Sequence, residues 1–112
     1  MYKVLKSEPE TFPKETFGIY YEVDIDGSNS EWRICAKDII DKFSKSHTIQ
    51  EVDVPPFYEN EDFTELKYKL DGAELTLSCD FLLYSIYVTT DSEKLTKELR
   101  HELGSMAGWE SE

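Results

Sequence analysis

The longest apolar run in the chain is Leu75–Thr90, in which Asp80 is the one charged residue. The run is longer than a typical strand and shorter than a membrane span. Leucine, aromatic and β-branched residues dominate it, a composition that is typical of strands rather than helices. We therefore expect two strands with a break at Ser78–Asp80, and the rest of the chain to be organised around them.

Two further segments show the alternation of apolar and polar residues that is typical of half-buried strands. In Phe17–Ile25 an apolar side chain recurs at every second position, which predicts an antiparallel strand. Leu66–Leu70 alternates in the same way, and the Asp71-Gly72 pair that follows favours a type I′ hairpin turn. A two-residue turn places apolar residues opposite one another in this register: Leu70 with Ala73, Tyr68 with Leu75 and Leu66 with Leu77.

The remaining strand predictions are shorter or less regular. Ile49–Val54 is expected to form a short strand that ends at Pro55-Pro56, with a loop after it. Phe81–Thr90 is apolar on both faces, which predicts a central strand. Residues 1–15 hold two prolines and are expected to be an irregular lead-in.

Between Ser28 and Lys45 the periodicity becomes helical. Ser28 and Glu31 have the spacing of a capping box. An alternative remains, because residues 32, 34 and 36 also alternate, so that Glu31–Ala36 could be a strand before a shorter helix. The long helix is preferred because one apolar stripe continues for three turns, through Trp32, Cys35, Ala36, Ile39, Ile40 and Phe43.

A second helix is predicted near the C-terminus. Thr90 and Glu93 repeat the capping-box spacing, and Gly104 stands where a C-cap is expected. Residues 105–112 are expected to be a loose tail. Between the caps, a narrow apolar stripe consists of Leu95, Leu99 and Leu103.

The expected elements follow the order β-α-β-β-β-β-α. Short turns between strands indicate a mainly antiparallel sheet of about five strands, and two helices most simply cover one face of it. The sequence therefore predicts a two-layer α+β fold, with residues 1–112 forming a single domain. If Phe17–Ile25 lies at an edge of this sheet, it could pair with a second copy.

Charge narrows the choice of partner. The chain has 24 acidic and 12 basic residues in 112, a net charge of −12. Such a surface repels nucleic acid and anionic membranes, so we expect neither as a direct partner, whereas a basic protein is attracted. The two cysteines lie in apolar segments and no signal-peptide pattern opens the chain, which favours buried free thiols and a cytoplasmic location.

The acids are densest in Ser46–Leu66, which contains no lysine or arginine. Aromatic residues interleave with them behind the stiff Pro55-Pro56 pair. One interpretation is a solvated loop whose rings fold onto the core. The other is a recognition surface for a basic partner, in which charge speeds encounter and rings supply affinity. In that case the partner-binding residues are Glu51, Asp53, Phe57, Tyr58, Glu59, Glu61, Asp62 and Glu65.

No catalytic or cofactor-binding motif is present. His47 and His101 are far apart in sequence, and neither has a metal-ligand spacing with Cys35 or Cys79. A segment that begins near the end of the first strand resembles a calcium-binding loop, but Arg33 stands where a bidentate glutamate is needed. We therefore expect no enzyme activity, no cofactor and no metal.

In size, charge and the acidic stretch with its aromatic residues, the chain resembles bacterial immunity proteins, which neutralise the toxin domains of contact-dependent and other secreted toxin systems. Glu22, Asp24 and Asp26 add to the resemblance, and no motif of one particular family is matched. The resemblance implies an inhibitor that occludes the cationic active site of a toxin such as a nuclease, with carboxylates in place of substrate phosphates.

Two alternatives remain open. A nucleic-acid mimic, or a phage-type inhibitor of a DNA-binding protein, would use the same electrostatics. A small ligand-binding domain would instead have a pocket between the sheet and the helices, lined by Tyr20, Tyr84 and Tyr87.

Overall fold

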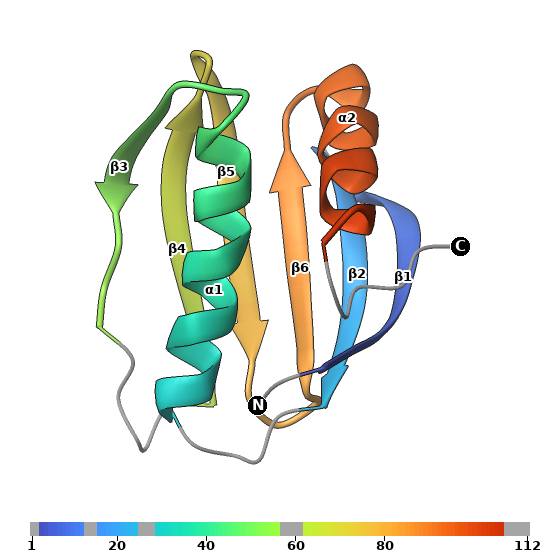
Figure 1. Ribbon diagram of the computed structural model, residues 1–112, viewed down its shortest axis with the longest axis vertical. Coiled ribbons are helices and arrows are strands. Elements are labelled where there is room, and N and C mark those ends of the chain that lie inside the picture. The colour runs from blue at the N-terminus through green and yellow to red at the C-terminus, as the bar shows by residue number, and fades with distance from the viewer. Residues whose placement is uncertain (1–2, 13–15, 25–28, 57–61, 107–112) are drawn as a thin grey trace.

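The computed structural model describes residues 3–12, 16–24, 29–56 and 62–106 (Figure 1). Six strands form one antiparallel sheet in the order β1-β2-β6-β5-β4-β3, and both helices lie on the same face of it. The predicted α+β class is confirmed, and from β2 onward the elements follow the predicted order. Their bounds are β1 (Lys3–Phe12), β2 (Thr16–Asp24), α1 (Asn29–Ser44), β3 (Ile49–Asp53), β4 (Phe63–Leu70), β5 (Ala73–Asp80), β6 (Ser85–Thr90) and α2 (Glu93–Gly104).

The predicted lead-in is wrong, because most of residues 1–15 form strand β1. This strand pairs with β2 from Lys3 opposite Asp24 to Phe12 opposite Thr16. Prolines suggested irregular structure, but an edge strand tolerates proline because the missing N–H can face away from its neighbour. As a consequence β2 lies between β1 and β6 and is not the free edge at which pairing with a second copy was considered.

The β4–β5 hairpin matches its prediction residue by residue. Asp71 and Gly72 have φ angles of 52° and 85°, the positive values that a type I′ turn requires. The observed register has the three predicted pairs, from Leu70 opposite Ala73 onward. Along β4 every second side chain is buried beneath the helices and the others are exposed, so a slip of one residue would reverse both faces.

The run Leu75–Thr90 forms two strands, but they are joined after Asp80 rather than at Ser78–Asp80. The Asp80 Oδ1 atom accepts hydrogen bonds from the backbone N–H groups of Leu82 (3.1 Å) and Leu83 (3.0 Å), which stabilise a turn in place of a longer strand. The predicted strand at residues 81–90 is therefore shortened to β6. As predicted, β6 is central, between β2 and β5.

Helix α1 is the long helix that its apolar stripe predicts, and the alternative strand at Glu31–Ala36 is wrong. Trp32 and Ala36 are buried, whereas Ile34 between them is 53% exposed. In a strand all three side chains would share one face. The capping box predicted at Ser28 lies outside the described residues.

Helix α2 begins two residues later than predicted. Thr90 is the last residue of β6, and the N-cap is Ser92, whose side chain accepts a hydrogen bond from the Leu95 N–H at 3.2 Å. Gly104 is the last helical residue and Ser105 is the C-cap. In the described part of the chain, neither helix is long and apolar enough to cross a bilayer. Most of the predicted loose tail, residues 107–112, lies outside the described ranges.

The core fills the space between the helices and the sheet. Cys35 and Cys79 lie within it as free thiols, as predicted. Burial raises the pKa of both, that of Cys79 to about 12, so both thiols remain protonated and unreactive at neutral pH. The largest buried side chains include Trp32, Ile39 and Phe43 of α1, Leu99 and Leu103 of α2, and Ile19, Tyr21, Leu70, Leu75, Leu77 and Ile86 of the sheet.

Candidate functional site

The structure divides the predicted partner-binding stretch between two places. Glu51 and Asp53 lie on β3, at the edge of the sheet, and a register shift separates them. Asp62 directly precedes β4, and Glu65 is its third residue. All four residues are exposed. The other four predicted residues, Phe57, Tyr58, Glu59 and Glu61, lie outside the described part of the chain.

A groove of about 660 Å³ separates α1 from β3 and the segment that follows it. Its volume is typical of sites for small ligands. Apolar side chains dominate the lining, and the charges at its rim are of both signs: Lys37 forms an ion pair with Asp41 at 2.8 Å, while Arg33 and Glu51 stand nearby. The groove is therefore apolar with balanced charge, and the surplus of acid is located elsewhere.

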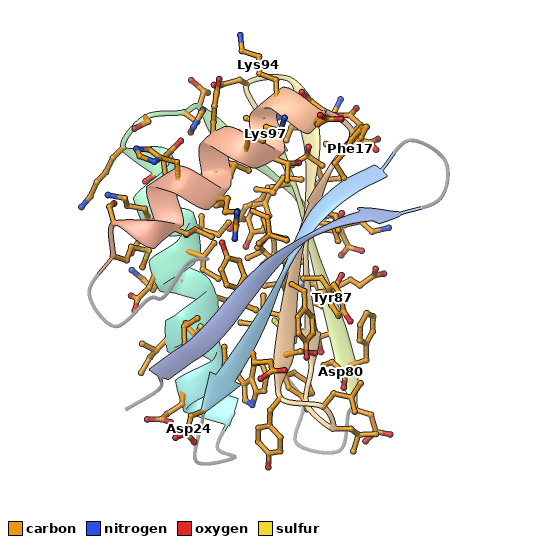
Figure 2. All side chains as sticks on the ribbon, turned by 90° about the vertical axis from the view of Figure 1, so that its right-hand side faces the viewer. Phe17, Asp24, Asp80, Tyr87, Lys94 and Lys97 are labelled. Carbon is orange, nitrogen blue, oxygen red and sulfur yellow. The ribbon has the colours of Figure 1, made fainter. Side chains whose placement is uncertain are left out.

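The three tyrosines that were expected to line one pocket are separated. Tyr20 and Tyr87 contact each other, with ring centroids 5.1 Å apart, on the face of the sheet opposite the helices (Figure 2). Tyr84 lies at the end of the sheet, where its ring stacks on Trp32. The predicted pocket of these three residues is therefore wrong.

The β5–β6 turn forms a compact end of the molecule with the neighbouring strands. The Phe81 N–H donates to the Asp62 carbonyl at 2.9 Å, and the Val23 N–H donates to the Tyr84 carbonyl at 3.0 Å. The turn is thus attached to β4 on one side and to β2 on the other. We call residues 81–84 together with Val23, Asp24, Asp62, Phe63 and Asp80 the hairpin end; it is at the bottom of Figure 1.

Large apolar side chains are exposed at the hairpin end. Leu82 and Leu83 are 66% and 68% exposed, and Phe63 and Tyr84 are each 45% exposed. The sequence pattern did not identify these side chains as exposed, because Leu82, Leu83 and Tyr84 were predicted to lie in a central strand. The signal that could have found the turn is Asp80, since an aspartate side chain readily accepts hydrogen bonds from the backbone N–H groups that follow it.

Trp32 of α1 supports this turn from the core side. Its ring meets Phe81 edge to face, with centroids 4.9 Å apart, and stacks on Tyr84 at 6.5 Å. Tyr84 has a φ of 50°, a left-handed conformation that costs a non-glycine residue roughly 1–2 kcal/mol. The stacking and the hydrogen bond from Val23 offset this cost, so the turn has one defined shape.

Charge is distributed unevenly between the two ends of the molecule. Asp24 and Asp80 lie at the hairpin end, and Lys94 and Lys97 lie at the opposite end (Figure 2). The three sequence segments 22–31, 57–65 and 80–85 contain no lysine or arginine. The first base along α1 is Arg33, which lines the groove. The hairpin end therefore combines exposed apolar side chains with acids from three segments that contain no base of their own, and Lys3 of β1 lies opposite Asp24 in the strand register.

The opposite end contains a partly buried charge cluster that sequence reasoning also missed. His47 is 8% exposed, and its two ring nitrogens lie 2.6 Å from Asp71 Oδ2 and 2.6 Å from Glu102 Oε2. Burial lowers the pKa of His47, but the hydrogen bonds to the two carboxylates outweigh it and the net effect raises this pKa. The hydrogen bond from His47 in turn lowers the pKa of Asp71. We call these three residues the His47 cluster.

The His47 cluster holds three elements together. His47 follows α1, Asp71 is in the β4–β5 turn and Glu102 is in α2. Asp71 Oδ1 also accepts a hydrogen bond from the Thr48 N–H at 2.8 Å. Both ring nitrogens contact carboxylates, so the imidazole connects α2 and the β4–β5 turn to the segment that follows α1.

Comparison of the chain with protein-family models, with curated proteins and with solved structures gave no match.

Proposed function

We propose that this protein is a small acidic inhibitor that binds a basic protein, in the manner of bacterial immunity proteins that neutralise toxin domains. The observation that carries the proposal is the charge at the hairpin end. Asp24 and Asp62 are exposed there and Asp80 precedes the turn. The segments 22–31, 57–65 and 80–85 contain no lysine or arginine, and Lys3 of β1 lies opposite Asp24 in the strand register. An excess of carboxylates attracts a cationic surface.

The proposed mechanism is occlusion of a cationic active site. The carboxylates take the positions of substrate phosphates, and the body of the protein blocks access. Complementary charge raises the rate of association by about 10- to 1,000-fold, with a steep dependence on salt. No covalent step is part of this mechanism, and no cofactor is needed. A cytoplasmic location is also part of the proposal, supported by two free and buried thiols.

A second candidate function is favoured by the groove between α1 and β3. Its apolar lining and volume of about 660 Å³ suit a small ligand or a short peptide segment. We rank it second because the groove has balanced charge and therefore does not account for the acidic character of the chain.

The test is affinity purification of the tagged full-length chain from its source cell, with washes at low and at high salt. We expect one basic protein in stoichiometric amount, released as salt rises. Salt dependence alone is insufficient, since any protein this acidic collects basic proteins weakly. The purified pair is therefore titrated again with Asp24→Asn/Asp62→Asn, for which we expect about 10-fold weaker binding at low salt.

The matched control is Glu74→Gln/Asp91→Asn, which removes the same charge from exposed residues away from the hairpin end. It should bind the partner with nearly unchanged affinity. Equal weakening by both variants would attribute binding to net charge alone and contradict the proposal. Absence of a stoichiometric basic protein from both washes would also contradict it, and the groove would then be the next site to test with small ligands.

A further inference from the structure

We infer that Leu82 and Leu83, at the tip of the β5–β6 hairpin, are the anchor of the partner-binding surface and insert into an apolar cleft of a basic protein. Tyr84 and Phe63 border this anchor. The inference rests on the proposed function and deepens it, because it names the surface and the chemistry of the partner's complementary site.

Within the described residues, no contact requires the two leucines to be exposed. They are more exposed than any other large apolar side chain among the residues with assigned burial, the next being Val52 at 59%. The turn itself does not require leucine, because Asp80 supplies the hydrogen bonds that form it. Turns of this kind ordinarily consist of glycine, asparagine, aspartate and serine. Adjacent exposed leucines therefore indicate a surface that is buried by a partner.

The tip is also organised in advance. Asp80 fixes the backbone N–H groups of Leu82 and Leu83, and Phe81 and Tyr84 are held against Trp32. The two leucine side chains are the most exposed part of this end, at 66% and 68%. A partner that buries them would not have to order the loop first, and this lowers the entropic cost of binding.

The charge near the tip indicates which class of partner binds it. Three aspartates lie near the apolar tip along the backbone: Asp80 directly precedes the turn, the Asp62 carbonyl accepts the Phe81 N–H, and Asp24 follows Val23, which donates to Tyr84. This arrangement predicts a partner cleft with an apolar floor and a rim of lysine or arginine. The same carboxylates repel an anionic membrane, and they would repel each other across a contact between two copies of this end. A basic protein is therefore favoured over a membrane surface or a second copy.

The experiment places a photo-activatable cross-linking amino acid at position 83 of the full-length chain, expressed in its source cell. The matched control carries it at position 52, the other strongly exposed apolar site, which lies on β3. We expect a covalent adduct with one basic protein from position 83 and none from position 52.

Affinity then tests the anchor directly with the purified cross-linked partner. We expect Leu82→Ser/Leu83→Ser to raise the Kd by about 100-fold or more, chiefly through faster dissociation, with little change in the salt dependence. Val52→Ser should change the Kd by less than about 3-fold. Both variants alter exposed side chains, and circular dichroism with urea unfolding verifies that each is folded.

Several outcomes would overturn the inference. If the partner binds Leu82→Ser/Leu83→Ser as tightly as the wild type, the anchor is elsewhere and the proposed function stands. If neither cross-linking nor affinity purification yields a basic protein, both fail. Flotation of the wild type, but not of the double variant, with phosphatidylglycerol vesicles would assign the tip to a membrane. Adducts between two copies of the chain would assign it to self-association.

Discussion

Carboxylates have different surroundings at the two ends of the sheet. At the His47 cluster, Asp71 and Glu102 both contact one imidazole at 2.6 Å, and the three side chains hold separate elements together. At the hairpin end, Asp24 and Asp62 are exposed and stand beside exposed leucines. The acids of the His47 cluster are paired with a histidine inside the fold, whereas Asp24 and Asp62 lie at the surface beside exposed apolar side chains. The difference distinguishes structural charge from charge that can bind a partner.

The largest expected effect is a loss of stability when the side chain that supports the hairpin end is removed. Trp32→Ala removes a ring that is 1% exposed and contacts Phe81 and Tyr84, so we expect a loss of about 3–5 kcal/mol in the free energy of unfolding. Urea unfolding monitored by circular dichroism measures this. Ile34→Ala on the exposed side of the same helix is the control and should change stability by less than about 0.5 kcal/mol. Equal losses in the two variants would contradict the proposed support.

A smaller loss of stability is expected from a substitution in the His47 cluster, at the opposite end. His47→Gln removes the cation between Asp71 and Glu102, leaving the part-buried Glu102 carboxylate without its charged donor. We expect a loss of about 1–2 kcal/mol at pH 6, reduced by the partial exposure of Asp71 to solvent. Affinity for a basic partner should be unchanged, because the His47 cluster lies at the other end from the proposed anchor. A variant that keeps its stability but loses binding would reverse the assignment of the two ends.

The stability contributed by the His47 cluster should also depend on pH with a definite sign. The pKa of His47 is raised above its ordinary 6.5, so its contribution is complete below pH 6.5 and is lost as pH rises through the native pKa. The pKa of Asp71 is lowered below its ordinary 3.8, so its contribution is present above pH 3.8 and is lost as pH falls through the native pKa.

The difference in the free energy of unfolding between wild type and His47→Gln should therefore be largest between pH 3.8 and 6.5 and should shrink above the native pKa of His47. Taking the difference in the free energy of unfolding between the two proteins cancels the effect of the remaining acids, because these acids are present in both. A difference that grows from pH 6 to pH 9 would contradict the charge assigned to His47.

The smallest expected effect is the stability of Leu82→Ser/Leu83→Ser. Because these side chains are 66% and 68% exposed, the free energy of unfolding should change by less than about 0.5 kcal/mol per residue. Urea titration beside the wild type measures this. A loss above 2 kcal/mol for the pair would show that the tip stabilises the fold and would remove the contrast between the two ends.

Local sequence patterns determined a large part of the fold. The three-turn apolar stripe predicted α1, and the Asp71-Gly72 pair predicted both the turn and the register of β4–β5. These features depend on residues within a few positions of one another, where backbone geometry sets the periodicity. The sequence alone also determined the surplus of acid and the two buried thiols.

Other features were decided by residues that are distant in sequence. Asp71 and Glu102 are 24 and 55 positions from His47, so no local spacing could identify them as its partners. The apolar residues that follow Asp80 suggested a strand, but they form a turn whose apolar residues Phe81 and Tyr84 pack on Trp32, about 50 positions away in the sequence.

The tertiary structure alone brings the ends of β2, β4 and β5 together, and so collects their acids around one exposed apolar tip (Figure 1). Composition fixes how much charge and apolar surface a chain has. The order of the strands decides where each of them lies, because hydrogen bonding between strands places side chains from remote segments next to one another.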